Sequence, residues 1–321
     1  MRSLNFYKLT KSLLLLLIPA AIFISCKKSN PLPGHEKTIY QTISCDPEYS
    51  FLTAAINKAG LVDALNKSGG KTTPLTLFAP TNAAFKAAGF NSVSDLAAVP
   101  DSTLQSILLY HVLGSKVEAG DIPQADNTAV TTLNGQPIYV TRTSSNKVFV
   151  NGVSVTKANI EASNGVIHQI NRVLIPATGT IVQTAIGNPN LSLLVAAVLR
   201  ASQGTTNVAA VLSGAGPFTV FAPTNQAFIN AGFADANAIN AADPNTLTSI
   251  LTYHVIAGRI FSSDLTDGEM PATVNGETVT ISLSGGATVK GKSNSTASNI
   301  IATDIVTTNG VVNVIDQVLL P

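Results

Sequence analysis

The sequence is poor in tryptophan, methionine, cysteine and charged residues. Among 321 residues there is no tryptophan, and there are two methionines, two cysteines and 12% charged residues. Two cysteines exclude a disulfide-rich scaffold and a zinc ribbon. Nineteen Lys and Arg face eighteen Asp and Glu, so no cationic excess exists to neutralise nucleic-acid phosphates. A hydrophobic content of 45% excludes a disordered chain, and the length predicts about two domains.

Residues 1–25 differ in composition from everything after them. They contain three cations and no anion, followed by an apolar stretch over residues 13–24 that includes Pro19. A transmembrane helix needs about 20 apolar residues, so this stretch is too short to span a membrane. The pattern is typical of a signal peptide, whose positive start is formed here by Arg2, Lys8 and Lys11.

Cys26 follows Ser25 at the end of the apolar stretch. A small residue followed by cysteine at this point resembles the lipobox of bacterial lipoproteins, where the cysteine is acylated and becomes the new N-terminus. We therefore expect a lipoprotein signal peptide over residues 1–25, lipidation of Cys26, and a tether over residues 26–37. This implies a bacterial cell-envelope protein, an outer-membrane lipoprotein that is periplasmic or surface-exposed. The alternative is an ordinary signal peptide, with Cys26 incidental.

Removal of the signal peptide changes the charge and the thiol content of the chain. The mature protein has 16 Lys and Arg against 18 Asp and Glu, a net charge of about −2. Cys45 would then be the only free thiol, and we expect a structural rather than a catalytic role for it.

Three sequence blocks recur in the same order about 143 residues apart. A period this long indicates a duplicated domain, because solenoid repeats are about 20–50 residues long. We expect a first domain over residues 38–176 and a second over residues 178–321, called here the first and second repeat. The recurring blocks are Thr76–Phe85 with Thr219–Phe228, Tyr110–His111 with Tyr253–His254, and Asn164–Pro176 with Asn309–Pro321.

Each repeat begins with helical periodicity and ends with β-strand patterns. Helices followed by strands, without β-α-β alternation, predict an α+β domain with a mainly antiparallel sheet. Predicted helices cover residues 49–58, 61–66, 101–111, 191–201, 208–212 and 244–254, and a helix follows each Pro-Thr-Asn. Predicted strands cover residues 75–79, 138–142, 148–150, 166–175, 218–222, 279–283, 288–290 and 311–320.

The recurring blocks resemble the fasciclin domain. One hallmark is Thr-Val-Phe-Ala-Pro-Thr-Asn-x-Ala-Phe, at 76–85 and 219–228; another is Asn-Gly-Val-Ile-His-x-Ile-Asp-x-Val-Leu-x-Pro, at 164–176 and 309–321. A Tyr-His pair lies between them. The resemblance covers nearly all of the mature chain. It implies two tandem α+β fasciclin-like domains, each a β-wedge of mainly antiparallel strands with packed α-helices.

The two repeats differ at several polar positions. The first has His168 where the second has Asn313, and Asn171 where the second has Asp316. Before the last block, the fasciclin family has an acidic residue followed by isoleucine, called here the acidic-Ile step. This step is Asp304–Ile305 in the second repeat and reads Asn159–Ile160 in the first. The repeats therefore do not share the polar constellation that a catalytic site would need.

The Tyr-His pairs have two interpretations. His111 and His254 are either pH switches or metal ligands, or they are buried rings that bond to a backbone carbonyl and lock a helix to the sheet; we favour the second. In some animal members of the family, this region and the Asp-Ile step are linked to integrin adhesion. The resemblance makes Tyr110, His111, Tyr253, His254, Asp304 and Ile305 candidate adhesion residues.

Catalytic and metal-binding motifs are missing from the sequence. No Gly-x-Ser-x-Gly occurs, and the glycine-rich segment 283–291 lacks the Lys-Ser/Thr of a P-loop and reads as a hairpin turn. Asp264, Asp267 and Glu269 form an acidic loop without EF-hand spacing, which we interpret as solvated surface. We expect no catalytic residue, no metal site and no cofactor.

These observations together predict a non-enzymatic, lipid-anchored cell-envelope protein that presents two fasciclin-like domains for adhesion or binding. The expected partners are a protein or polysaccharide at the cell surface, extracellular-matrix-like ligands included, with membrane contact through the lipid. Nucleic acid is not an expected partner. Two alternatives remain open: a structural accessory of an outer-membrane nutrient-uptake complex, and a polymer hydrolase.

Overall fold

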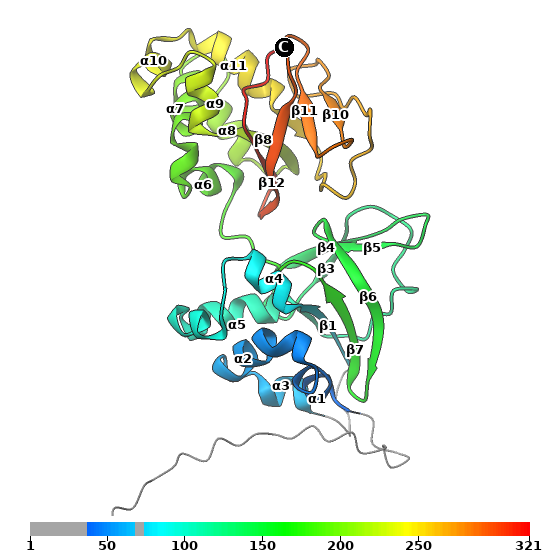
Figure 1. The fold of residues 1–321 in the computed structure, drawn as a ribbon. Helices are drawn as coiled ribbons and strands as arrows, with labels where there is room; N and C mark the ends of the chain where they lie inside the picture. The colour runs from blue at the N-terminus through cyan, green and yellow to red at the C-terminus, as the bar shows by residue number, and fades with distance from the viewer. Residues whose placement is uncertain (1–36, 68–73) are drawn as a thin grey trace, which may run out of the picture. The chain divides into compact units, whose positions relative to one another are not determined.

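The structure is a computed structural model that describes residues 37–67 and 74–321. The predicted signal peptide, the predicted lipidation site Cys26 and the predicted tether up to residue 36 lie outside the described residues. In both repeats the helices lie at one side of a single sheet (Figure 1). The predicted α+β class is therefore confirmed.

Along the chain of the first repeat, helices come both before and after the first strand, and the remaining strands follow the last helix. Its helices are α1 (Ile39–Ser44), α2 (Ser50–Lys58), α3 (Val62–Asn66), α4 (Asn82–Ala87) and α5 (Asp101–Tyr110), with 3-10 turns at Pro47–Tyr49 and Val93–Ala98. Its strands are β1 (Leu75–Pro80), β2 (Val112–Leu113), β3 (Thr128–Thr131), β4 (Pro137–Arg142), β5 (Val148–Val150), β6 (Val153–Ala162) and β7 (Gly165–Ile170).

The second repeat follows the same plan. Its helices are α6 (Ile181–Ile186), α7 (Ser192–Ala201), α8 (Val208–Ser213), α9 (Asn225–Asn230), α10 (Ala236–Ala241) and α11 (Pro244–Tyr253), with a 3-10 turn at Pro189–Leu191. Its strands are β8 (Phe218–Pro223), β9 (Val255–Ala257), β10 (Thr280–Ser282), β11 (Thr288–Lys290), β12 (Ser298–Thr307) and β13 (Gly310–Ile315).

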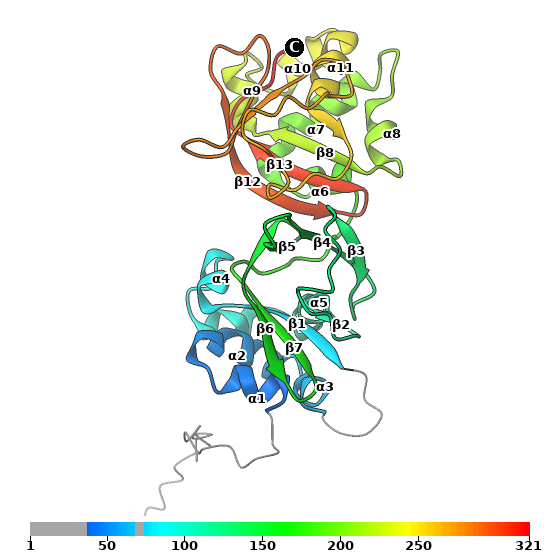
Figure 2. The same ribbon diagram turned by 90° about the vertical axis from the view of Figure 1, so that its right-hand side faces the viewer.

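The first sheet has the strand order β2-β1-β7-β6-β5-β4-β3, and the second, read from the corresponding edge, has β9-β8-β13-β12-β11-β10. The two orders correspond strand for strand, except that β3 has no counterpart in the second sheet. All neighbours pair antiparallel except β1 with β7 and β8 with β13, which are parallel. Figure 2 shows the long antiparallel pairs β6–β7 and β12–β13, which lie beside β1 and β8 respectively. Parallel strands are usually buried on both faces, and all six residues of β13 are buried here. The first and third recurring blocks thus contribute the parallel pair inside each sheet, β1 with β7 and β8 with β13.

The Pro-Thr-Asn turns after β1 and β8 begin a helix as the sequence predicts. Thr81 Oγ1 accepts from Ala84 N, and Thr224 Oγ1 accepts from Ala227 N, each at 3.2 Å. A threonine oxygen in this position binds an otherwise unpaired N–H of the first helical turn. The same turns bury Phe85 and Phe228 against the helical core.

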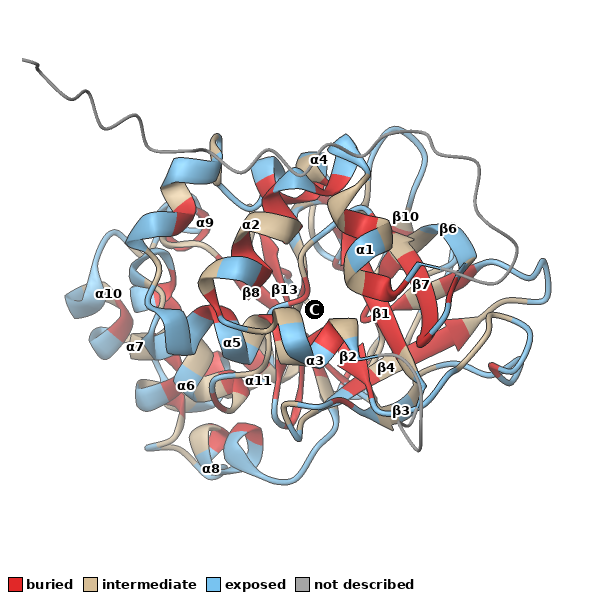
Figure 3. Ribbon diagram, turned by 90° about the horizontal axis from the view of Figure 1, so that it is seen from below, coloured by how far each residue is buried: buried red, intermediate tan, exposed pale blue. Residues whose placement is uncertain are grey.

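Each repeat has two apolar cores. One fills the space between helices and sheet, and the other lies inside the fold of the sheet around Phe78 in the first repeat and Phe221 in the second. Figure 3 shows the buried residues on the helix faces and strands that meet, with exposed residues outside. The two phenylalanines of one motif therefore pack in different cores. Phe78 and Phe221, on the strands, lie in the core inside the sheet, whereas Phe85 and Phe228, on the helices, lie in the core between helices and sheet.

The final strands are shorter than predicted. β7 ends at Ile170 and β13 at Ile315, whereas the apolar pattern predicts strands to residues 175 and 320. Beyond these points the backbone leaves the sheet, and Leu174 N and Leu319 N donate to histidine side chains instead. These residues remain buried, which is why their pattern resembles a strand.

Cys45 corrects one expectation. It is disulfide-bonded in the structure, so it is not the free thiol that the sequence predicts.

Among residues 37–67 and 74–321, no helix is long and apolar enough to span a membrane.

Candidate functional site

The Tyr-His pairs lie where the last long helix of each repeat meets the segment after the final strand. His254 caps α11, and its Nδ1 donates to Ile250 O at 2.8 Å while its Nε2 accepts from Leu319 N at 2.9 Å. His111 repeats both bonds with Ile107 O and Leu174 N, at 2.7 and 2.9 Å. Each ring therefore fastens a helix to the segment that closes its repeat, close to the structural interpretation of the sequence.

These contacts fix the protonation state of both rings. A backbone N–H can only donate, so Nε2 must be an acceptor and the ring proton resides on Nδ1. Burial lowers the pKa of both His111 and His254 from 6.5 to about 4, and the bond to the carbonyl on the preceding turn offsets this only in part. Both rings are neutral at physiological pH.

The tyrosines before these histidines are fully buried. Tyr253 Oη donates to Thr278 O at 2.6 Å and accepts from Lys292 N at 2.9 Å. Tyr110 Oη donates to Pro137 O and accepts from Asn151 Nδ2, both at 3.0 Å, and burial raises its pKa to about 12. Both hydroxyls hold strand backbones in place and have no free hydrogen-bonding capacity directed at solvent.

Asp304 and Ile305 lie at an irregularity of β12, where the strand register shifts against β13. Asp304 has a left-handed backbone with φ of 63°, which is uncommon for a non-glycine residue. Its buried carboxylate accepts from Ser262 N at 2.7 Å and Ser262 Oγ at 2.6 Å, and pairs with Arg172 at 3.3 Å. Ile305 is half-buried against the helical core.

The exchange of His168 for Asn313 preserves one interaction at this irregularity. In the second repeat, Asn313 Oδ1 accepts from Asp304 N at 3.0 Å. In the first, His168 Nδ1 accepts from Asn159 N at 3.2 Å, and Asn159 also has a positive φ, of 56°. Two different side chains thus pair the same backbone N–H, so the difference between the repeats has a structural explanation.

The structure does not gather the predicted adhesion residues into one exposed site. Each Tyr-His pair is buried in its own repeat, and Asp304 is buried in the second. Their role in adhesion stays a prediction. The contacts to Ser262 and Arg172 were not expected from the sequence. Ser262 lies outside the recurring blocks, and Arg172 lies in a block whose second-repeat counterpart has Gln317 at that position.

The acidic loop of the second repeat is an arrangement of turns. Asp264 accepts from Phe261 N at 2.8 Å and Glu269 from Thr266 N at 3.1 Å. Asp267 accepts from Leu283 N at 2.6 Å, so it binds another strand end. Within the part of the chain that the structure describes, no group of three or more His, Cys, Asp or Glu residues is placed to hold a metal ion.

The sequence analysis also missed an apolar cavity between α6 and α7 of the second repeat. At this cavity the second repeat has Ile186 and Leu199 where the first repeat has Ser44 and Asn57. Such a difference is visible only once the two repeats are aligned through their structures.

Comparisons with known proteins match both repeats. A model of the fasciclin domain matches residues 47–176 and 190–321. The protein sll1483 of Synechocystis sp. is 40% identical over 144 residues, which is 44% of this chain and 73% of that protein. The transforming growth factor-beta-induced protein ig-h3 of Sus scrofa is 27% identical over 310 residues, 90% of this chain and 42% of that protein.

Two further similarities each cover most of this chain. Human periostin is 29% identical over 248 residues, 77% of this chain and 28% of that protein. The chain thus spans less than half the length of ig-h3 and periostin. The solved FAS1 domain pair of the insect cell adhesion molecule fasciclin I is 20% identical, with a TM-score of 0.41 over 84% of this chain and 96% of that one. Because the family model matches most of both repeats, the chain belongs to the fasciclin domain family.

Proposed function

We propose that the chain is a non-enzymatic adhesion or binding protein of the bacterial cell envelope, anchored by lipid on Cys26. Membership of the fasciclin domain family, over both repeats, carries this proposal. The polar residues that recur between the repeats support it, because their side chains bond to the protein's own backbone and are not grouped as nucleophile, base and acid.

Two copies of one scaffold suit noncovalent binding. Linked sites raise the apparent affinity when a partner can engage both at once, because the second contact forms at a high effective concentration. The mature chain is slightly acidic and rich in Thr, Ser and Asn. Such a composition fits a protein or polysaccharide partner outside the cytoplasm better than a nucleic acid.

The lipid anchor is tested by replacing one cysteine at a time. We expect Cys26→Ala to move the protein from the membrane fraction to the soluble fraction of the envelope, and Cys45→Ala to leave it in the membrane. Retention of Cys26→Ala in the membrane fraction contradicts lipidation.

The binding role is tested on intact cells. Cells that carry the chain are compared with cells that lack it for retention on surfaces coated with matrix protein or with polysaccharide, after surface protease treatment has established exposure. Equal retention on every surface contradicts an adhesive role. Turnover of an ester or glycan by the purified protein, lost on one side-chain replacement, contradicts the non-enzymatic assignment.

A further inference from the structure

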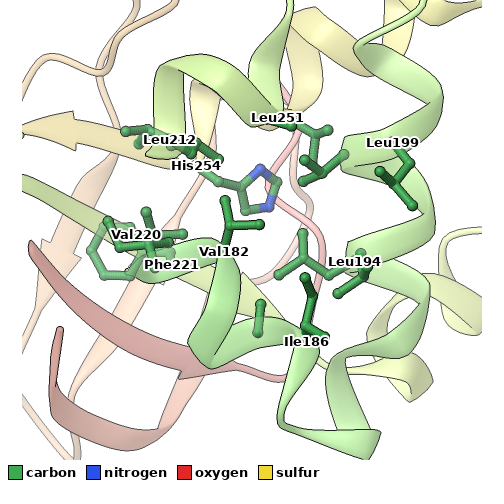
Figure 4. Close-up of a pocket in the computed structure, with 15 residues that line it drawn as sticks. Val182, Ile186, Leu194, Leu199, Leu212, Val220, Phe221, Leu251 and His254 are labelled. Carbon is green, nitrogen blue, oxygen red and sulfur yellow. The ribbon is translucent and has the colours of Figure 1, made fainter. Parts of the chain in front are cut away.

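The second repeat contains an apolar cavity of about 80 Å³ between α6, α7, α8, β8 and α11. Figure 4 shows the His254 ring among aliphatic side chains from these elements, including Val182 and Leu251. Both ring nitrogens are already hydrogen-bonded, to Ile250 and Leu319. No charged side chain lines the cavity, so it offers no partner to a charged or hydroxyl-bearing group.

The cavity opens to solvent along apolar side chains. Ile186 at the end of α6 and Leu199 on α7 both line it, yet they are 63% and 60% exposed. A single exposed aliphatic residue needs no explanation. Two of them lining one apolar cavity extend its apolar surface outward to solvent.

The first repeat shows what this region looks like when it is closed. Equivalent backbone bonds align the two repeats at the start of α1 with α6 and of α2 with α7. Ile39 N and Ile181 N donate to Asn164 and Asn309, and Phe51 N and Leu193 N donate to Asn82 and Asn225. This alignment places residue 40 opposite 182 and residue 57 opposite 199.

At the aligned positions the first repeat has larger or more polar side chains. Tyr40 Oη donates to Asn57 Oδ1 at 2.7 Å and joins α1 to α2 where the second repeat has its opening. The corresponding cavity of the first repeat is about 20 Å³ and has no lining residue from α1. The replacements from first to second repeat are Tyr40 by Val182, Ile43 by Ala185, Ser44 by Ile186, Ile56 by Val198 and Asn57 by Leu199.

We propose that this cavity binds one straight aliphatic chain, such as the acyl tail of a fatty acid. Its volume is about half that of the ~150 Å³ engineered cavity that holds benzene, so an aromatic ring or a sugar does not fit inside. The tail enters with its methyl end, its last carbons are enclosed beside Val182 and Ala185, and the following carbons lie along Ile186 and Leu199. The head group stays in solvent.

The test titrates the full-length protein with straight-chain carboxylates from hexanoate to dodecanoate, below the concentration at which they form micelles. We expect shifts of the Ile186 and Leu199 methyl resonances and about fourfold tighter binding for each added methylene, until the apolar surface is covered. Dodecylphosphocholine is expected to bind like dodecanoate, since the tails are identical. Binding that follows the head group instead of the tail overturns the proposal.

Variants that restore first-repeat side chains close the cavity. Ala185→Ile with Val198→Ile is expected to weaken dodecanoate binding by about tenfold or more, because the added carbons occupy the space of the tail. Ile186→Ser should also weaken it, whereas Ile301→Ser removes an equally exposed isoleucine on β12 and should not. Amide spectra confirm that each variant is folded.

Three further outcomes overturn the proposal. They are the absence of dodecanoate binding at millimolar concentration, equal losses in Ile186→Ser and Ile301→Ser, and unchanged binding when the cavity is filled. The chain could also fail to bind dodecanoate and yet lose capture of a partner protein when the cavity is filled. That result overturns the proposal and assigns the cavity to an apolar side chain of the partner.

Discussion

Lowering the pH from 8 to 5 is expected to destabilise the second repeat through His254. The neutral ring accepts a hydrogen bond from Leu319 N, so a proton on Nε2 would place two donors against each other in a buried site. The folded protein keeps a pKa of about 4 for this group, against 6.5 for an exposed histidine. Because the folded pKa is the lower one, stability is fully present above pH 6.5 and is lost as the pH falls towards 4.

The magnitude follows from the difference in protons bound. One pKa unit corresponds to about 1.4 kcal/mol, so at pH 5, about 1.5 units below the unfolded pKa, the loss is ~2 kcal/mol; it levels off near ~3 kcal/mol below pH 4. The second repeat is the cleaner case, because Asn313 stands there where the first repeat has His168, whose pKa burial also lowers.

The assay is urea denaturation followed by circular dichroism at several pH values, together with NMR titration of the histidine rings. His254→Gln keeps one acceptor and one donor but cannot titrate, so its free energy of unfolding is expected to be lower at pH 8 and less dependent on pH than in the unchanged protein. A His254 ring that titrates near pH 6.5 in the folded state, or equal pH dependence in both proteins, would refute the reasoning.

Three further changes probe the second repeat, each measured by the free energy of unfolding. Phe221→Ala should cost ~3–5 kcal/mol, since it empties the core inside the sheet; less than about 1 kcal/mol contradicts its burial. Gly310→Ala should cost ~1–3 kcal/mol or more, because a Cβ would overlap the Phe218 carbonyl oxygen across the parallel pair. Asn309→Ala should cost about 3 kcal/mol by leaving Ile181 N and two carbonyls unpaired; full stability in either variant contradicts these contacts.

Much of the fold was predictable because it depends on local pattern. Apolar spacing located most of the helices, and the Pro-Thr-Asn turns located the caps at Thr81 and Thr224. The long strands β6 and β12 were missed because their irregularities at Asn159 and Asp304 interrupt the period of two that marks a strand. A residue with positive φ in a strand is visible only in the structure.

The candidate sites were less predictable, because they depend on which distant segments meet. The sequence placed His254 at a helix end but did not show that Leu319 N would be its partner. It placed Asp304 in the acidic-Ile step but not against Ser262. The cavity depends on the sizes of side chains from five elements, and no pattern within any one of them predicts it.

The duplication separates structural from specialised residues within one chain. Tyr253 and His254 recur in the first repeat with equivalent backbone partners, so the fold alone accounts for retaining them. A binding function that differs between the repeats must instead depend on positions where the repeats differ without loss of the fold. Val182 and Leu199 are such positions: Tyr40 and Asn57 join the same two helices by a hydrogen bond in the first repeat, whereas in the second the same helices border an open apolar cavity. Differences between the repeats, more than their shared motifs, are therefore the positions at which the proposed ligand binding should be tested.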